Sequence, residues 1–119
     1  MNFLSPLAPH VHWALRLSLA ATFLYHGIGK FPIADFSAAM GMSLPLAWAV
    51  ALAEIVGGTA LIAGAFGKDA LTRIGGMIVI VIMIGAIGMV HFKQGFTGME
   101  FQILMLATGL YFAARGNEV

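Results

Sequence analysis

The sequence contains no cysteine and very few charged residues, and both absences restrict what it can do. Without a thiol, the chain cannot form disulfides or bind a metal or an iron–sulfur cluster through cysteine. Its six Lys and Arg and five Asp and Glu residues are scattered rather than gathered into a basic stripe. We therefore expect no nucleic-acid partner, and any redox chemistry requires a group from outside the chain.

The shortage of charge also indicates the solvent of this protein. Hydrophobic residues make up 61% of the chain and the mean hydropathy is +0.96. A water-soluble domain of this size needs polar side chains over most of its surface, which so few charged residues cannot supply. The composition predicts an integral membrane protein, and the lack of Lys or Arg in residues 1–12 predicts that no signal peptide is cleaved.

Four apolar segments are long enough to cross a bilayer as helices, at residues 13–31, 46–66, 71–92 and 97–114. Continuous apolar runs differ from the alternating pattern of barrel strands. Between the first two runs, "PIADFSAAMGMSLP" is too short and too mixed to span a membrane. The sequence thus predicts an all-α, four-helix transmembrane bundle in one domain, residues 1–119, with a short interfacial segment between helices 1 and 2.

The glycines indicate how the helices of such a bundle pack, and the basic residues indicate its orientation in the membrane. Many of the 15 glycines lie inside the apolar segments, where small residues allow helices to approach closely. We expect Gly57→Leu or Gly58→Leu to destabilise the bundle more than Gly116→Leu. Lys and Arg are slightly more frequent at the end of the bundle that carries the termini, which favours a multi-pass protein with both termini in the cytoplasm.

A few polar side chains gather near one membrane face when the helices are placed antiparallel. They are His26, Lys30, His91, Lys93 and Glu100, with Glu54 roughly 12 Å deeper in the apolar layer. A carboxylate at that depth is costly unless it binds a proton or a cation, and either Arg16 or His26 could pair with it. We treat Arg16 and Glu54 as a candidate structural ion pair.

Four of these side chains form the candidate binding site: His26, Lys30, Glu54 and His91. Histidine and a buried carboxylate supply a hydrogen-bond donor and a proton exchanger of adjustable pKa. No His-x-x-x-His or Glu-x-x-His spacing occurs, so we expect no metal site. No catalytic residue is identified.

Several stretches together resemble the DoxX family over nearly the whole chain. They are Arg16, "FLYHGIGKF" at 23–31, "AEIVGGTALIAGAFG" at 53–67, His91, Glu100 and the terminal "LYFAARGNEV". The resemblance implies a small bacterial membrane protein of four helices, with family positions at Arg16, His26, Gly27, Lys30, Glu54, Gly57, Gly58 and His91. The ending departs from the family, where a glycine-rich turn is often followed by Ser-Leu-Asp.

The resemblance also implies a function class, because the family is associated with quinone-linked sulfur oxidation and redox-associated membrane complexes. It suggests a subunit of such a complex in the bacterial inner membrane, which contacts a membrane quinone and a partner protein. This chain is not expected to be an autonomous enzyme. Two alternatives stay open: a non-enzymatic anchoring subunit for a larger partner, and a proton or small-solute path, for which homo-oligomerisation would be needed.

Overall fold

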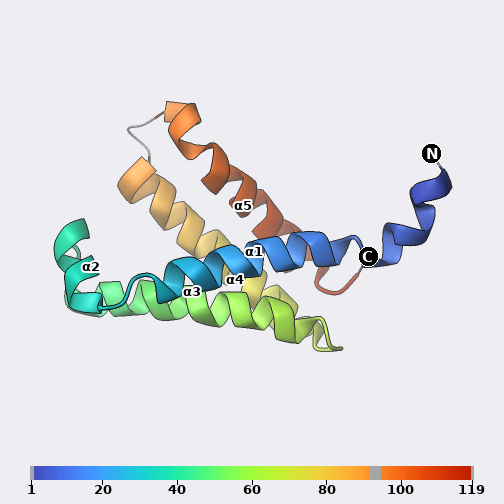
Figure 1. The fold of residues 1–119 in the computed structure, drawn as a ribbon, viewed down its shortest axis with the longest axis horizontal. Coiled ribbons are helices and arrows are strands. Elements are labelled where there is room, and N and C mark those ends of the chain that lie inside the picture. Colours follow the sequence, from blue (N-terminus) through green and yellow to red (C-terminus); the bar gives the residue numbers. More distant parts are fainter. Residues whose placement is uncertain (1, 92–94, 119) are drawn as a thin grey trace.

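The fold is entirely helical in the part of the chain that can be described. The computed structural model describes residues 2–91 and 95–118, including every side chain in these ranges except those of Val90 and His91. The elements in chain order are η1 (Asn2–His10), α1 (His12–Ile28), α2 (Ile33–Met40), α3 (Leu44–Gly64), α4 (Asp69–Ala86), the π-helical turn η2 (Ile87–His91) and α5 (Gly95–Arg115) (Figure 1). The predicted all-α class is confirmed.

Local sequence signals explain where several helices begin and end. Ser43 caps α3, since its hydroxyl accepts a hydrogen bond from the backbone N–H of Leu46 at 3.4 Å, and Pro45 lies in the first turn. Gly41 ends α2 in the left-handed region at φ 65°, which glycine adopts without strain. The segment expected between the first two spans therefore forms the short helix α2.

Two helices in the described residues are long and apolar enough to cross a membrane: α3 and the stretch Asp69–Met89. The helices α1 and α5 correspond in sequence to the first and fourth apolar segments, and α1 has 17 residues. The structure thus contains two candidate spans, and a bundle that crosses the membrane four times stays a prediction.

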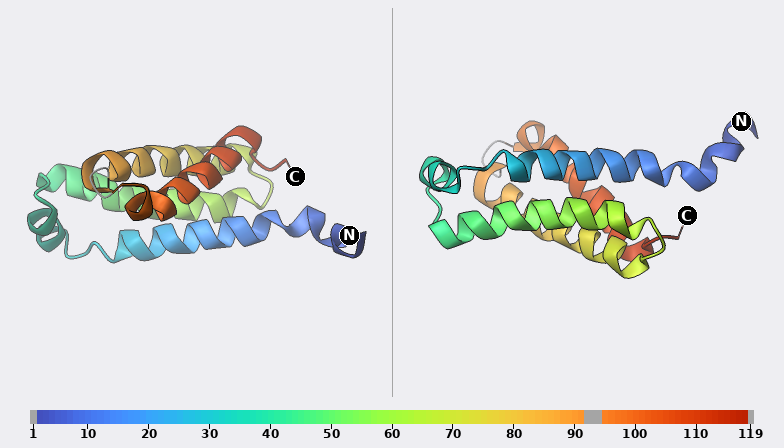
Figure 2. Two further views of the ribbon diagram at one scale, coloured as in Figure 1. Left: turned by 90° about the horizontal axis from the view of Figure 1, so that it is seen from above. Right: turned by 60° about the horizontal axis from the view of Figure 1, so that its bottom comes forward.

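The long helices pack in sequence, and this leaves one side of the bundle open. Helix α1 lies along α3, α3 along α4, and α4 along α5 (Figures 1 and 2). Helices α1 and α5 meet near the termini, where the Arg16 guanidinium carbon lies 4.9 Å from the centre of the Phe112 ring. From there α5 diverges from α1 toward the opposite end, so the two helices enclose a wedge (Figure 1).

The core lies between the helices, and many large apolar side chains point outward. The buried cluster includes Leu19, Phe23, Leu61, Val79 and Phe112. On the outer faces, by contrast, Val81 is 68% exposed and Leu104 64%. An outer surface this apolar suits lipid better than water.

Glycines permit the closest helix contacts, with one result that differs from the expectation. A Cβ on Gly76 would lie 2.5 Å from the backbone nitrogen of Ala113, and one on Gly58 would lie 3.0 Å from the carbonyl oxygen of Ala20. Gly116, chosen above as an unconstrained position, is at φ 60°, and a Cβ there would collide with the Asp69 carboxylate. Gly116 is therefore constrained as well, and the matched comparison needs another glycine.

Candidate functional site

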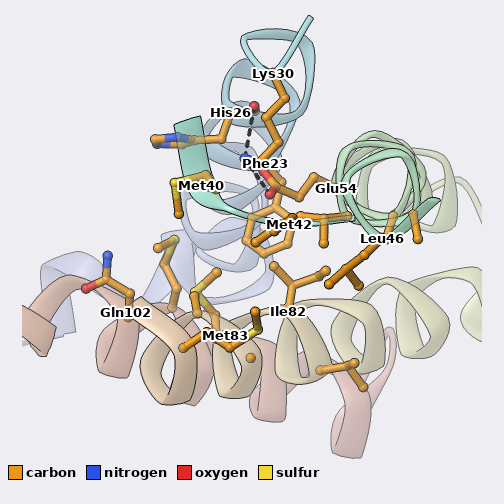
Figure 3. A pocket seen from close by; sticks show the side chains of 18 of the residues that line it. Phe23, His26, Lys30, Met40, Met42, Leu46, Glu54, Ile82, Met83 and Gln102 are labelled. Carbon is orange, nitrogen blue, oxygen red and sulfur yellow. Dashed lines mark hydrogen bonds and ion pairs between the residues drawn. The ribbon is translucent and has the colours of Figure 1, made fainter. Parts of the chain in front are cut away.

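A cavity of about 540 Å³ occupies the wedge between α1 and α5, at the end away from the termini. This volume falls within the range of about 300 to 1,000 Å³ that is usual for small-molecule sites. All the long helices and α2 contribute to its lining, which is mostly apolar (Figure 3). Its apolar residues include Phe23, Phe36, Met40, Met42, Leu46, Ile82, Met83, Met89, Phe101 and Met105.

The position of the cavity follows from the packing order of the helices. Thr22 and His26 of α1 lie on one wall, Gln102 of α5 lies on another, and α3 and α4 supply the floor. Residues of α2 close the end of the cavity that lies beyond α1. Many of the apolar lining residues are methionines, whose unbranched side chains adapt to ligands of irregular shape.

The polar centre of the cavity is an ion pair between Lys30 and Glu54. Lys30 Nζ lies 2.7 Å from Glu54 Oε1, and the two side chains are 15% and 6% exposed. Lys30 Nζ also donates to the backbone oxygen of His26 at 3.2 Å and lies 5.2 Å from the centre of the Phe36 ring. In such a poorly hydrated place the removal of one partner leaves the other as an uncompensated charge.

Gly27 explains why Lys30 reaches this carboxylate. A Cβ on Gly27 would lie 3.0 Å from the Ala51 carbonyl oxygen and 3.1 Å from Glu54 Cβ, so α1 and α3 are in close contact there. Lys30 follows three residues later, just past the end of α1, and its side chain turns back over the last turn. The glycine therefore brings Glu54 within reach of the lysine.

The predicted ion pair between Arg16 and Glu54 is wrong. The Arg16 Nη1 donates to the carbonyl oxygen of Leu61 and, at 2.9 Å, to Thr72 Oγ1, while Nη2 donates to Asn117 Oδ1 at 3.2 Å. Arg16 is only 1% exposed. Glu54 lies beside Gly27, close to the end of α1 that carries Lys30, and not as deep in the apolar layer as the sequence suggested.

The partners of Arg16 belong to a compact polar network at the terminal end of the bundle. The amide of Asn117 donates to the Gly64 carbonyl oxygen at 2.8 Å and accepts from the Thr72 hydroxyl at 2.6 Å. At the other side, Arg16 Nε donates to His12 Nδ1 at 3.4 Å. Because Nδ1 accepts this bond, the His12 ring carries no proton on that nitrogen in this arrangement.

The other predicted site residues have different positions. His26 lies at the edge of the cavity and is exposed, with its ring centre 5.7 Å from that of Tyr25. Figure 3 shows its ring pointing away from the ion pair. The structure therefore brings His26, Lys30 and Glu54 to one cavity, while the side chain of His91 lies outside the described residues.

Gln102 lines the cavity from α5 and is not among the site residues predicted from the sequence. Its amide stands opposite α1 and is the polar group that the fourth apolar segment adds to the site (Figure 3). The sequence signal that could have identified Gln102 was a lone amide inside an apolar run.

In residues 2–91 and 95–118, no group of three or more His, Asp or Glu is arranged to hold a metal ion.

Comparison with known proteins identifies the family to which this arrangement belongs. The sequence model of DoxX matches residues 12–92, which include α1, Lys30, Glu54 and the whole of α3 and α4. The chain belongs to the DoxX family. It is accordingly a membrane protein with at least two apolar candidate spans.

A relative from Bacillus subtilis extends the similarity beyond the matched region. The chain is 32% identical over 109 residues to "Putative oxidoreductase CatD" of Bacillus subtilis (strain 168), a match that covers 87% of this chain and 78% of the relative. No solved structure matches the chain at a comparable level.

Proposed function

We propose that this DoxX protein is a quinone-binding subunit of a redox-linked complex in the bacterial inner membrane. The observation that carries the proposal is the Lys30–Glu54 ion pair on the wall of a mostly apolar cavity of about 540 Å³. A charged pair is costly inside a lipid-facing bundle, and intramembrane ionisable residues are associated with ligand and proton sites. The relative named as an oxidoreductase supports the redox link.

The membrane arrangement in this proposal has four spans, formed by α1, α3, α4 continued through η2, and α5. The strongly exposed apolar side chains, such as Val81 and Leu104, would face lipid. Both termini lie at the same end of the bundle, as an even number of spans requires (Figures 1 and 2). We assign that end to the cytoplasm, since Lys68, Arg73 and Arg115 lie there.

The donor set and the shape of the cavity fit a quinone. Aromatic and methionine side chains suit a flat ring, and an apolar tail would extend along the apolar lining between α1 and α5 toward lipid. Lys30, Glu54, His26 and Gln102 offer hydrogen-bond donors and acceptors, and His91 is a further candidate. A bound quinone would supply exchange of two electrons and two protons.

The residues of this chain would bind the ring, keep water from it and exchange protons through Glu54 or His26. Because cysteine is absent, the sequence offers no dithiol and no cysteine-ligated cluster to carry the electrons. In this proposal a partner subunit delivers or removes them. The homo-oligomeric state is a separate property that a mild-detergent purification measures.

The test is the quinone content of the protein purified from bacterial membranes in mild detergent. We expect extractable quinone in the parent protein and a loss of about tenfold or more in Lys30→Met and Glu54→Leu, because each change strands a charge or removes a ring-binding group. Glu100→Gln is the matched control, since Glu100 is exposed on α5 and does not line the cavity. Absence of quinone from the parent, or equal content in all variants, would refute the proposal. A stoichiometric partner protein without quinone would support the anchoring alternative.

A further inference from the structure

The two oxygens of Glu54 differ in their surroundings. Oε1 contacts Lys30 Nζ, whereas Oε2 receives no hydrogen bond from any of the residues that the structure describes. In the same residues, no side-chain nitrogen or oxygen is both inaccessible and without a partner. Glu54 as a whole is 5% exposed and lines the cavity. The accessible side of Oε2 therefore faces the cavity.

This access matters when a ligand fills the cavity. Water can donate to Oε2 in the free protein, but a ring that occupies the space displaces that water. A buried acceptor without a donor is costly, and more so when it is charged. Sites with such a polar group discriminate strongly against a ligand that cannot complete the hydrogen bond.

The oxidised and reduced forms of a quinone differ in this respect. The dione carries two carbonyl oxygens that only accept, whereas the dihydroxy form carries two O–H groups that both donate and accept. Lys30 is ion-paired with Glu54 and donates to the His26 carbonyl oxygen, and a further N–H of its ammonium serves either form, because hydroxyl and carbonyl oxygens both accept. Gln102 also serves either form, since its amide carries both a donor and an acceptor. Glu54 Oε2 thus becomes the group that distinguishes them.

We infer that Glu54 makes the cavity bind the reduced, dihydroxy form of a quinone more tightly than the oxidised, dione form. The inference rests on the proposed function and adds the redox form of the ligand to it. A hydroxyl of the reduced form donates to Oε2, and the ion pair with Lys30 stays intact. The oxidised form leaves Oε2 without a donor.

The experiment measures binding rather than turnover. A benzoquinone with a saturated alkyl tail, its hydroquinone and the dimethyl ether of that hydroquinone are each equilibrated anaerobically with the intact, detergent-purified protein. We expect the hydroquinone to bind at least about fivefold more tightly than the benzoquinone. The ether, which has the same ring but no O–H, should lose this advantage.

A variant tests the role of the carboxylate directly. Glu54→Gln replaces an acceptor with a group that also donates to a carbonyl, so the ratio of the two affinities should fall to about one, whereas Glu100→Gln should keep it. Equal affinity of the parent protein for the benzoquinone and hydroquinone, or tighter binding of the ether than of the hydroquinone, would overturn the inference and leave the proposed function intact. Binding of none of the three compounds would refute the proposed function together with the inference. The ether comparison uses the unaltered protein, so it decides the question even where Glu54→Gln fails to fold.

Discussion

A cation lies at each end of α1, and the two cations have very different environments. Near the termini, Arg16 is 1% exposed and bonds to the neutral acceptors Leu61 O, Thr72 Oγ1 and Asn117 Oδ1. Just past the opposite end of the helix, Lys30 pairs with a carboxylate beside a cavity. One cation is enclosed by fixed partners, and the other borders open space.

This difference indicates a structural role for the Arg16 end of α1 and a binding role for the Lys30 end. The planar guanidinium of arginine suits several acceptors in fixed directions, whereas the lysine ammonium can exchange partners as a ligand arrives. Between the two ends lie the buried side chains of Leu19, Phe23 and Leu61. Among the described residues, the buried polar side chains are Arg16 and Thr72 at one end and Glu54 at the other, which counts against a continuous proton or solute path through the interior of the bundle.

The largest effect on stability is expected when the arginine is removed. Arg16→Met leaves the Leu61 carbonyl oxygen and the Thr72 hydroxyl with fewer partners in a buried place, so the free energy of unfolding should fall by about 3 kcal/mol. Lys68→Met, at an exposed position, should change it by less than about 0.5 kcal/mol. Denaturation of both variants in the same detergent checks this. Equal stability of Arg16→Met and Lys68→Met would show that the network is not structural.

A second effect tests the helix contacts that hold the terminal end together. In Gly76→Ala the new Cβ would meet the backbone of Ala113 and Gly109, which cannot move aside as a side chain can, so we expect a loss of about 2 kcal/mol. Gly85→Ala on the same helix meets no atom within 4 Å and should be neutral or slightly stabilising. Melting temperatures of the two variants provide the comparison. A larger loss for Gly85→Ala would contradict the helix packing.

A third prediction concerns which cation is coupled to Glu54. Single changes Lys30→Met and Glu54→Leu each leave one charge without its partner at the cavity, while the double variant leaves none, so a double-mutant cycle should show a coupling of about 1 to 2 kcal/mol. The corresponding cycle for Arg16 and Glu54 should give a coupling within about 0.5 kcal/mol of zero. The reverse order of the two coupling energies would restore the pairing expected from the sequence.

The sequence was sufficient for the helices because long apolar runs and their Pro and Gly boundaries are local signals. The expected segment 46–66 and the observed α3, Leu44–Gly64, differ by two residues at each end. The same reasoning indicated that Glu54 needs a cation and that Lys30 lies near the membrane face. These features depend on composition and spacing along one helix.

The register between helices could not be obtained in this way. The register depends on how closely α1 approaches α3, which Gly27 and Gly58 decide. A shift of about one turn between the two helices is enough to make Lys30, rather than Arg16, the partner of Glu54. Asn117 is a similar case, since its role as a ligand of Arg16 requires the C-terminal residues to fold back against α1. Gln102 joins the cavity only because α5 diverges from α1.

The smallest expected effect on stability is at His26. It tests whether a residue at the cavity can be changed without disturbing the fold. The His26 side chain is exposed and makes an edge contact with Tyr25, while Lys30 bonds to its backbone oxygen, which a substitution keeps. His26→Ala should therefore change the free energy of unfolding by less than about 0.5 kcal/mol. In the proposed function the imidazole is one of the groups that contact the ring, so quinone retention should nevertheless fall severalfold. Tyr25→Ala removes the neighbouring ring contact without altering a cavity residue, and it should leave retention unchanged. If His26→Ala lowered stability as much as Arg16→Met, His26 would belong to the architecture, and the contrast between the two ends of α1 would fail.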